Sequence, residues 1–182
     1  MAVKEKLRKK FLKIRKRKYF EIKPSFFNPL ISLVKKKLKR KKILLSFYYP
    51  SNFETNVLQI VNNNFFKNVT TLLPVIKKKN NMKFFKWKNN DVLKVNTYGM
   101  LEPVNVGRSL QPNIILLPLI AFDTYKNRLG YGKGYYDRFL NSPKNKKILK
   151  VGVAFSHQKY KKLPNSKLDV KLDYILTEKG LA

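Results

Sequence analysis

The chain has 182 residues, of which 41 are Lys or Arg and 10 are Asp or Glu, so its formal net charge is +31. A hydrophobic fraction of 43% with 13% aromatic residues is typical of a folded globular domain and argues against disorder despite the charge. The longest apolar run is too short to cross a membrane, the basic N-terminus lacks the apolar core of a secretory signal, and the absence of cysteine excludes disulfide frameworks and zinc fingers. We therefore expect one cytoplasmic domain over residues 1–182.

The first half of the chain alternates predicted helices with predicted strands. Leu7, Phe11 and Ile14 follow helical spacing among basic residues, which predicts an amphipathic helix over about residues 3–19. A second helix is predicted to begin near Pro29, because proline is favoured in the first turn. β-branched and apolar runs predict the later strands. In order, we expect a strand over 42–49, a helix over 54–66, a strand over 68–76, a turn over 77–81 and an edge or hairpin strand over 82–87.

The second half continues the alternation. The stretch YGMLEP closes with a proline and predicts a loop, whereas NIILLPLIAF predicts the clearest core strand. In order, we expect a loop over 98–103, a strand over 113–122, a helix over 135–142 and strands over 150–155 and 173–178. Strands that alternate with helices indicate an α/β fold, here a three-layer domain with a central, largely parallel but mixed sheet flanked by helices.

The stretch NRLGYGKGYYDRFL, residues 127–140, places three of the seven glycines of the chain at alternate positions. Glycines without Cβ atoms let backbone N–H groups approach and surround a phosphate. Arg128 and Lys133 flank this stretch as cations, and Asp137 is a carboxylate of the kind that holds a divalent metal. Two interpretations stay open at this point, a phosphate-binding loop and a glycine-rich turn that precedes a helix.

Four segments in order resemble the 5-formyltetrahydrofolate cyclo-ligase family, also called methenyltetrahydrofolate synthetases. Residues 121–140, AFDTYKNRLGYGKGYYDRFL, look like the family signature. The segments KEKLR at 4–8, YGMLEP at 98–103 and KLDVKLDYILTEKG at 167–180 resemble its N-terminal, central and closing motifs. The resemblance implies an ATP- and Mg²⁺-dependent enzyme that converts 5-formyltetrahydrofolate to 5,10-methenyltetrahydrofolate. In the family, ATP phosphorylates the formyl oxygen, N10 attacks the activated carbon, and ADP and phosphate are released.

The resemblance also assigns site residues. The implied catalytic residues are Arg128 and Lys133, and the implied Mg²⁺ ligands are Asp137 and Asp169. The implied ATP-binding residues are Lys4, Arg8, Arg128, Leu129, Gly130, Tyr131, Gly132, Lys133, Gly134, Tyr135 and Tyr136. The implied substrate-binding residues are Phe47, Asn52, Tyr131, Gly132, Lys133, Gly134 and Tyr135. The implied partner is 5-formyltetrahydrofolate, with or without a polyglutamate tail, and the implied state is a monomer with no membrane partner.

One position departs from the family pattern. Where the family places a glutamate near the substrate, this chain has Asn52, and Glu54 follows two residues later. Asparagine forms hydrogen bonds but carries no charge, so a contact that needs a carboxylate would be lost there. This leaves open either a shifted register of the match at this position or a folate-binding but catalytically weakened member of the family.

The charge leaves a further alternative, a basic protein that binds nucleic acid through phosphate neutralisation. Residues 1–42 contain 18 Lys or Arg against two acidic residues, and the rest of the chain supplies a further +15. Because the excess is spread along the chain, we favour compositional drift, with nucleic acid attracted only non-specifically. Glu102 and Asp123 are each open to a local or a functional role, whereas local roles rather than catalysis are expected for His157 and Asp173.

Overall fold

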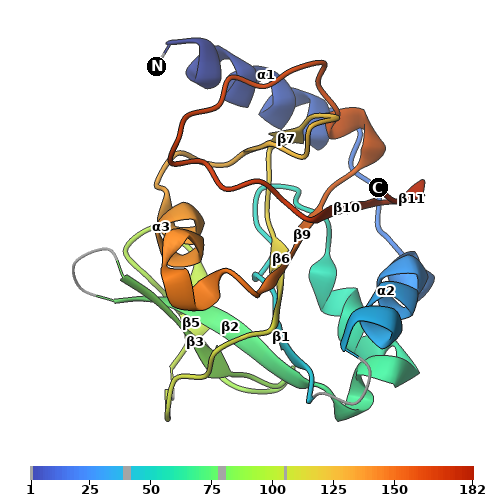
Figure 1. Ribbon diagram of the computed structural model, residues 1–182, viewed down its shortest axis with the longest axis vertical. Helices are drawn as coiled ribbons and strands as arrows, with labels where there is room; N and C mark the ends of the chain where they lie inside the picture. The colour runs from blue at the N-terminus through green and yellow to red at the C-terminus, as the bar shows by residue number, and fades with distance from the viewer. Residues whose placement is uncertain (1, 39–41, 78–80, 105) are drawn as a thin grey trace.

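The computed structural model describes residues 2–38, 42–77, 81–104 and 106–182 and shows a seven-stranded sheet covered by helices (Figure 1). The α-helices are α1 (Ala2–Arg17), α2 (Asn28–Leu38) and α3 (Tyr135–Asn141). The strands are β1 (Leu44–Ser46), β2 (Thr70–Lys77), β3 (Asn81–Lys86), β4 (Leu93–Val95), β5 (Leu101–Pro103), β6 (Ile114–Leu117), β7 (Ala121–Phe122), β8 (Arg128–Leu129), β9 (Leu149–Val153), β10 (Tyr174–Thr177) and β11 (Gly180–Leu181).

The large sheet is mixed and mostly parallel. Its strand order is β11-β10-β9-β6-β1-β2-β3, and the five strands from β10 to β2 pair in parallel. The two edge strands, β3 and β11, are antiparallel to their neighbours. Two small antiparallel pairs, β4–β5 and β7–β8, lie outside this sheet. The predicted α/β fold with a largely parallel sheet is therefore confirmed.

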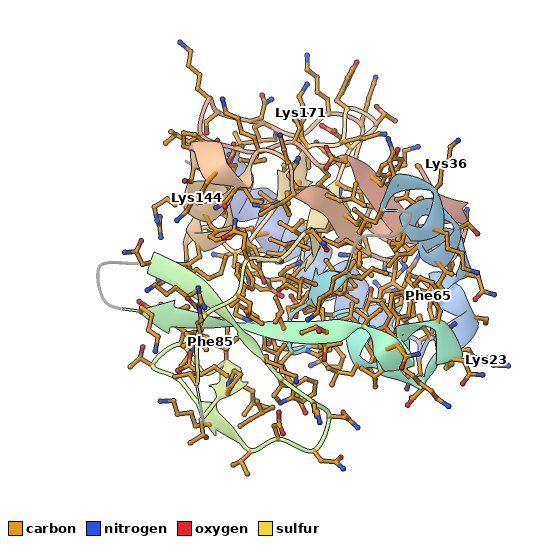
Figure 2. The ribbon with its side chains drawn as sticks, turned by 60° about the horizontal axis from the view of Figure 1, so that its bottom comes forward. Lys23, Lys36, Phe65, Phe85, Lys144 and Lys171 are labelled. Carbon is orange, nitrogen blue, oxygen red and sulfur yellow. The ribbon has the colours of Figure 1, made fainter. Side chains whose placement is uncertain are left out.

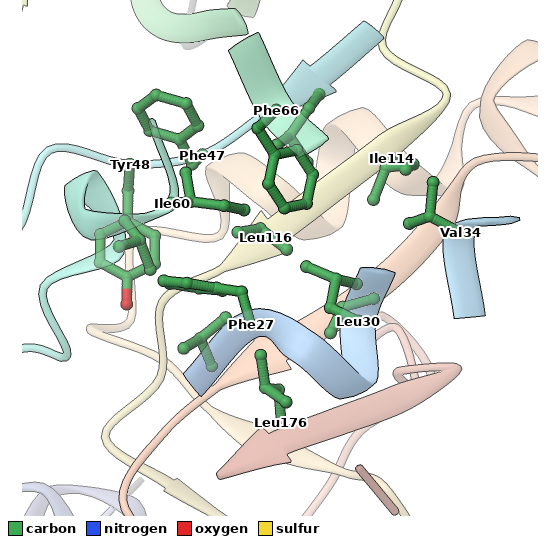
Figure 3. Packing of buried hydrophobic residues seen from close by; sticks show 14 of the residues in the cluster. Phe27, Leu30, Val34, Phe47, Tyr48, Ile60, Phe66, Ile114, Leu116 and Leu176 are labelled. Carbon is green, nitrogen blue, oxygen red and sulfur yellow. The ribbon is translucent and has the colours of Figure 1, made fainter. Parts of the chain in front are cut away.

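Both faces of the sheet are buried, because successive residues of a strand point to opposite faces. Ile114 of β6 belongs to a core cluster with Leu30 of α2, on the side shown in Figure 3. The next residue, Ile115, belongs to a second cluster with Leu140 of α3. All four side chains are almost completely removed from water. Helices thus cover the sheet on both faces, which gives the three layers that the sequence predicts.

The carboxyl ends of β1 and β6 form the point where the sheet changes direction. From β1 the chain moves outward to β2, and it then returns to β6 on the other side of β1 before it continues to β9 and β10. In open α/β sheets, ligands bind in the crevice at such a switch point. Residues 47–56 follow β1 there, and residues 118–134 follow β6, so the glycines lie where a ligand is expected.

The predicted helix over residues 54–66 is wrong. The chain instead forms two short 3₁₀ turns, Val57–Asn62 and Asn64–Asn68. Between them the side chain of Asn63 accepts a hydrogen bond from the backbone N–H of Phe65. Asparagine side chains compete with the backbone in this way, and a run of three asparagines interrupts the α-helix despite the apolar residues around it.

Two further boundaries differ from the prediction. Residues 101–103 were expected in a loop but form β5, which pairs with β4 across a turn in which Gly99 has φ +74°. The strand expected over 113–122 ends at Leu117, because Pro118 has no N–H to donate, and it resumes as β7. The turn predicted over 77–81 falls mainly on residues 78–80, outside the described residues. The other predicted helices and strands are confirmed to within a few residues of their bounds.

The positive charge is spread over the surface. These charges include Lys23, Lys36, Lys144 and Lys171, which come from four separate segments, are all exposed, and lie at different sides of the molecule (Figure 2).

Among the described residues, no helix is both long enough and apolar enough to cross a bilayer.

Candidate functional site

The glycine loop, defined here as residues 130–134, connects β8 to α3. Gly132 and Gly134 have φ values of +95° and +67°, in the left-handed region that favours glycine. The residues at the tip, 131–133, are exposed, so their backbone is open to a ligand. The sequence predicts a loop of this kind from its alternating glycines. Its exposed position beside the switch point of the sheet satisfies the condition that a phosphate-binding loop must meet.

Arg8 of α1 holds one side of this loop. Its Nε donates a hydrogen bond to the carbonyl oxygen of Gly130 at 2.9 Å. A Cβ atom at Gly132 would lie 3.0 Å from Nη2 of Arg8, which is too close for any other residue without displacement of the guanidinium. The absence of a side chain at Gly132 therefore lets a cation approach the loop backbone, as an anion site requires.

Lys4 of α1 and Arg128 of β8 each pair with a carboxylate. Lys4 Nζ lies 2.7 Å from Asp169 Oδ2, and Arg128 Nη2 lies 2.7 Å from Asp137 Oδ1. Asp137 Oδ1 also accepts the backbone N–H of Val170 at 3.1 Å, which joins α3 to the segment that carries Asp169. The two carboxylates predicted to hold Mg²⁺ therefore belong to contacting segments, and each is balanced by a cation.

Asp169 is held in its ionised form. Partial burial raises the pKa of this carboxyl group, but hydrogen bonds from Lys4 and Ser166 outweigh that effect, so the net pKa lies below its usual value. An ionised carboxylate is the form that ligates a hard cation such as Mg²⁺. No cluster of three or more His, Cys, Asp or Glu side chains that could hold a metal occurs in the described part of the chain. One or two carboxylates suffice for Mg²⁺ bound together with phosphate.

Lys133 points from the loop toward the β4–β5 hairpin. Its Nζ lies 5.7 Å from the centre of the Tyr98 ring, and that ring meets Tyr135 edge-on with centroids 5.8 Å apart. Beside Tyr98, a cavity of about 280 Å³ is lined by residues of the hairpin and β2, among them Ile76 and Glu102. The hairpin thus contacts the glycine loop through Tyr98, at a place where the sequence predicts only a loop.

The two residues predicted to bind folate from the β1 side occupy different environments. Phe47 is fully buried in the core, where its ring meets Trp87 edge-on at 5.9 Å (Figure 3). Asn52 is exposed and adopts a left-handed backbone with φ +48°, followed by Phe53 with φ +62°. These two left-handed residues turn the chain so that the next side chain, that of Glu54, is buried.

Arg15 and Glu54 belong to the site, and sequence reasoning assigned a role to neither. Arg15 has 1% of its surface exposed, and Glu54 has 6%. The hydroxyl of Tyr131 accepts a hydrogen bond from Arg15 Nη2 at 2.6 Å and donates one to Glu54 Oε1 at 2.8 Å. The signal for Arg15 was present, because positions 7, 11 and 15 share one helical face. It was hidden because Arg15 lies in a run of surface cations.

The remaining candidates have local partners. Glu102 accepts the backbone N–H of Ile76 at 3.4 Å, and Asp173 accepts the backbone N–H of Lys150 at 2.7 Å. The ring of His157 stacks on Phe155 with centroids 5.3 Å apart. Burial lowers the pKa of His157, and the nearby Glu178 opposes this shift only in part. These contacts agree with the local roles expected for His157 and Asp173, and Glu102 has a local partner as well.

Asp123 fixes the turn that leads into the glycine loop. Asp123 is buried, and its carboxylate accepts hydrogen bonds from the backbone N–H groups of Tyr125, Asn127 and Leu163 and from the Asn127 side chain. Burial raises its pKa, but these hydrogen bonds outweigh burial and bring the net pKa below the usual value. Stability from this group is therefore present above the unfolded pKa of about 4 and lost as the pH falls through the folded value.

We expect Asp123→Ala to lower the free energy of unfolding by about 3 kcal/mol at pH 7, because several buried N–H donors lose their acceptor. Urea unfolding at pH 7 measures this loss. Repetition at pH 3 should give a smaller difference from the unsubstituted protein, since the unfolded state then takes up a proton and part of the stabilisation by the native carboxylate is lost. A difference that does not depend on pH would contradict the role of the ionised form.

The chain is similar to known proteins over most of its length. The family model described as the 5-formyltetrahydrofolate cyclo-ligase family matches residues 1–178. A 5-formyltetrahydrofolate cyclo-ligase of Haemophilus influenzae is 35% identical over 142 residues, 75% of this chain and 75% of its own. The solved structure of Aquifex aeolicus 5,10-methenyltetrahydrofolate synthetase superposes with a TM-score of 0.75 at 32% identity and covers 98% of this chain and 91% of its own. A Mycoplasma pneumoniae synthetase, 24% identical with a TM-score of 0.71 over 95% of this chain and 97% of its own, shares the fold.

Proposed function

The chain belongs to the 5-formyltetrahydrofolate cyclo-ligase family, and we propose that it converts 5-formyltetrahydrofolate to 5,10-methenyltetrahydrofolate with ATP and Mg²⁺, releasing ADP and phosphate. One observation carries this proposal. The glycine loop of the family signature, which contains Lys133, is exposed beside the switch point of the sheet, and Arg8 contacts it. The resemblance to the family covers nearly the whole chain, so the proposal does not depend on the loop alone.

The reaction requires a poor electrophile to be activated. Phosphorylation of the formyl oxygen converts it to a leaving group, N10 of the same folate attacks the formyl carbon, and the carbon–oxygen bond breaks as phosphate departs. Such a reaction depends on positioning and on neutralisation of the phosphate charge. In this proposal Lys133 binds the transferred phosphoryl group, Arg8 and Arg128 bind the other phosphates, and Tyr131 and Tyr135 face the folate.

The residues present fit a nucleotide phosphate. Nε of Arg128 is buried and has no hydrogen-bond partner among the described residues, although Nη2 of the same guanidinium pairs with Asp137. A buried donor without an acceptor is costly, and an anionic ligand would satisfy it. The glycine loop offers backbone that no Cβ atom shields, on the side where Arg8 approaches. A buried free donor and an open backbone together favour a phosphate here.

The carboxylates of Asp137 and Asp169 fit Mg²⁺, which prefers hard oxygen ligands. When bound, the metal would neutralise charge on the phosphate oxygens. Lys4 and Arg128 balance these carboxylates in the structure, so metal loading would free both cations to bind phosphate oxygens instead. The same two pairs would hold the segments in place before the ligands arrive.

The direct test follows the absorbance of methenyltetrahydrofolate with purified protein, ATP, Mg²⁺ and 5-formyltetrahydrofolate. We expect product that depends on all three additions, together with one ADP for each methenyl group formed. A protein that binds folate without turnover would support the catalytically weakened alternative. A protein that binds neither folate nor ATP would contradict the proposal.

Asn52→Glu tests the departure from the family pattern. We expect this change to lower KM for 5-formyltetrahydrofolate by about tenfold, because a charged hydrogen bond to the pterin would be restored. It should also cost about 1 kcal/mol of stability, since asparagine tolerates the left-handed backbone of this position better than glutamate. Asn52→Gln is the matched control for side-chain length. Equal KM values for the two variants would show that the carboxylate is not needed.

A further inference from the structure

Three side chains joined by hydrogen bonds link segments that are far apart in the sequence. Arg15 lies on α1, Glu54 follows β1, and Tyr131 is in the glycine loop. The hydroxyl of Tyr131 lies between the other two, because it accepts from Arg15 and donates to Glu54. The second carboxylate oxygen of Glu54 accepts the backbone N–H of Ser51 at 2.9 Å. Arg15 and Glu54, the two outer residues of this hydrogen-bonded series, are therefore each held by a segment other than the glycine loop.

Arg15 also fixes the backbone on both sides of the switch point. Its guanidinium donates to the carbonyl oxygen of Asn52 at 2.7 and 3.1 Å and to that of Leu119 at 3.1 Å. Burial of a guanidinium and a carboxylate costs free energy unless both are fully hydrogen-bonded. Tyr131 is the side chain that joins the two charged groups, so the loop completes an otherwise costly pair.

A second arginine on the same helix, Arg8, contacts the backbone of the glycine loop. Arg8 is seven residues before Arg15, which places both on the same side of α1 two turns apart. Arg8 binds the carbonyl of Gly130, and Arg15 binds the side chain of Tyr131. Glycines leave a loop free to adopt many conformations, and these two contacts restrict that freedom at adjacent residues.

We propose that Arg15, Tyr131 and Glu54 are positioning residues that hold the tip of the glycine loop in the conformation that receives the nucleotide phosphates. The proposal rests on the proposed function, because it takes the loop to bind ATP. The proposal predicts a change in the apparent affinity for ATP. If the hydroxyl bridge is removed, the binding-competent loop is less populated, and the apparent affinity for ATP falls in proportion. Saturating ATP repopulates that conformation, so the loss appears in KM for ATP.

Tyr131→Phe removes only the bridging hydroxyl. We expect KM for ATP to rise about tenfold, the usual effect of one hydrogen bond to a charged group. Glu54→Gln keeps an acceptor for the hydroxyl and should give a smaller rise. The double variant should resemble Tyr131→Phe, because Glu54 acts through the Tyr131 hydroxyl. Tyr125→Phe, which removes a hydroxyl from an exposed tyrosine, is the matched control.

Two measurements separate the possible failures. In the protein without ligands, trypsin should cleave after Lys133 about tenfold faster in Tyr131→Phe than in Tyr125→Phe if the bridge holds the loop. Unchanged cleavage and unchanged KM for ATP, even with a lower melting temperature, would overturn the inference and leave the proposed function intact. A different result is that Tyr131→Phe is cleaved faster than Tyr125→Phe while the unsubstituted protein binds no ATP. That result would show that the hydroxyl bridge holds the loop, and it would overturn the proposed function. Additive effects in the double variant would overturn the link through Tyr131.

Discussion

Lys133→Ala is expected to lower kcat by about 10²- to 10³-fold, because a cation that contacts the transferred phosphoryl group stabilises charge in the transition state. The side chain is exposed at the tip of the glycine loop, so its loss should leave the free energy of unfolding within about 0.5 kcal/mol of the unsubstituted value. Steady-state kinetics at saturating ATP and folate, together with urea unfolding, measure the two quantities.

Lys144→Ala is the matched control for Lys133→Ala. It removes the same charge from another exposed lysine, which lies beyond the far end of α3 (Figure 2). If the overall positive field attracts the substrates, both variants should raise KM by similar factors. A Lys133→Ala protein that keeps more than a third of its kcat would contradict contact with the transferred group.

Asp137→Asn is expected to lower turnover by about 100-fold and to raise the Mg²⁺ concentration needed for half-maximal activity, because the amide is a poor ligand for a hard cation. The structure adds a cost that the sequence did not indicate. Asp137 balances Arg128, whose side chain is 6% exposed, so stability should also fall by about 1–3 kcal/mol. Magnesium titration of the rate and urea unfolding measure these effects.

Asp173→Asn separates the two roles of Asp137. Asp173 also pairs with a cation, Lys150, at 3.0 Å and accepts a backbone N–H, but sequence and structure both assign it a local role. We expect this variant to lose stability while its turnover and its Mg²⁺ requirement remain unchanged. If the two variants lose turnover in proportion to stability, Asp137 has a structural role alone.

The sequence predicted the layers of this fold well, and the reason is periodicity. The run of apolar residues at 114–117 is buried on both faces of the sheet, and Leu7 and Phe11 lie on the buried face of α1. The helix expected over 54–66 failed because asparagine side chains bind the local backbone, an effect that an apolar pattern does not contain. Proline at 118 likewise ended a strand inside an apolar run.

The part of the candidate site that lies within one continuous segment could be predicted from the sequence. The residues that join the site through contacts between distant segments could not. The glycine loop could be read directly from its residues. Arg15 could not be told apart from neighbouring cations such as Lys16, because its role comes from carbonyl oxygens that the fold brings to it. Glu54 drew notice only for its distance from Asn52, since the left-handed turn that buries it cannot be read from the spacing.

The contacts that complete the site join the beginning of the chain to its later parts. Lys4 meets Asp169 across 165 positions, and Arg15 meets Tyr131 across 116. Closure of such long intervals is slow, so the sheet can form while α1 is still undocked. A newly synthesised chain would thus contain native strands before it has a working catalytic centre. Additions before α1 would hinder this final docking more than equal additions beyond β11, because α1 carries Lys4 and Arg15 whereas β11 lies at an edge of the sheet.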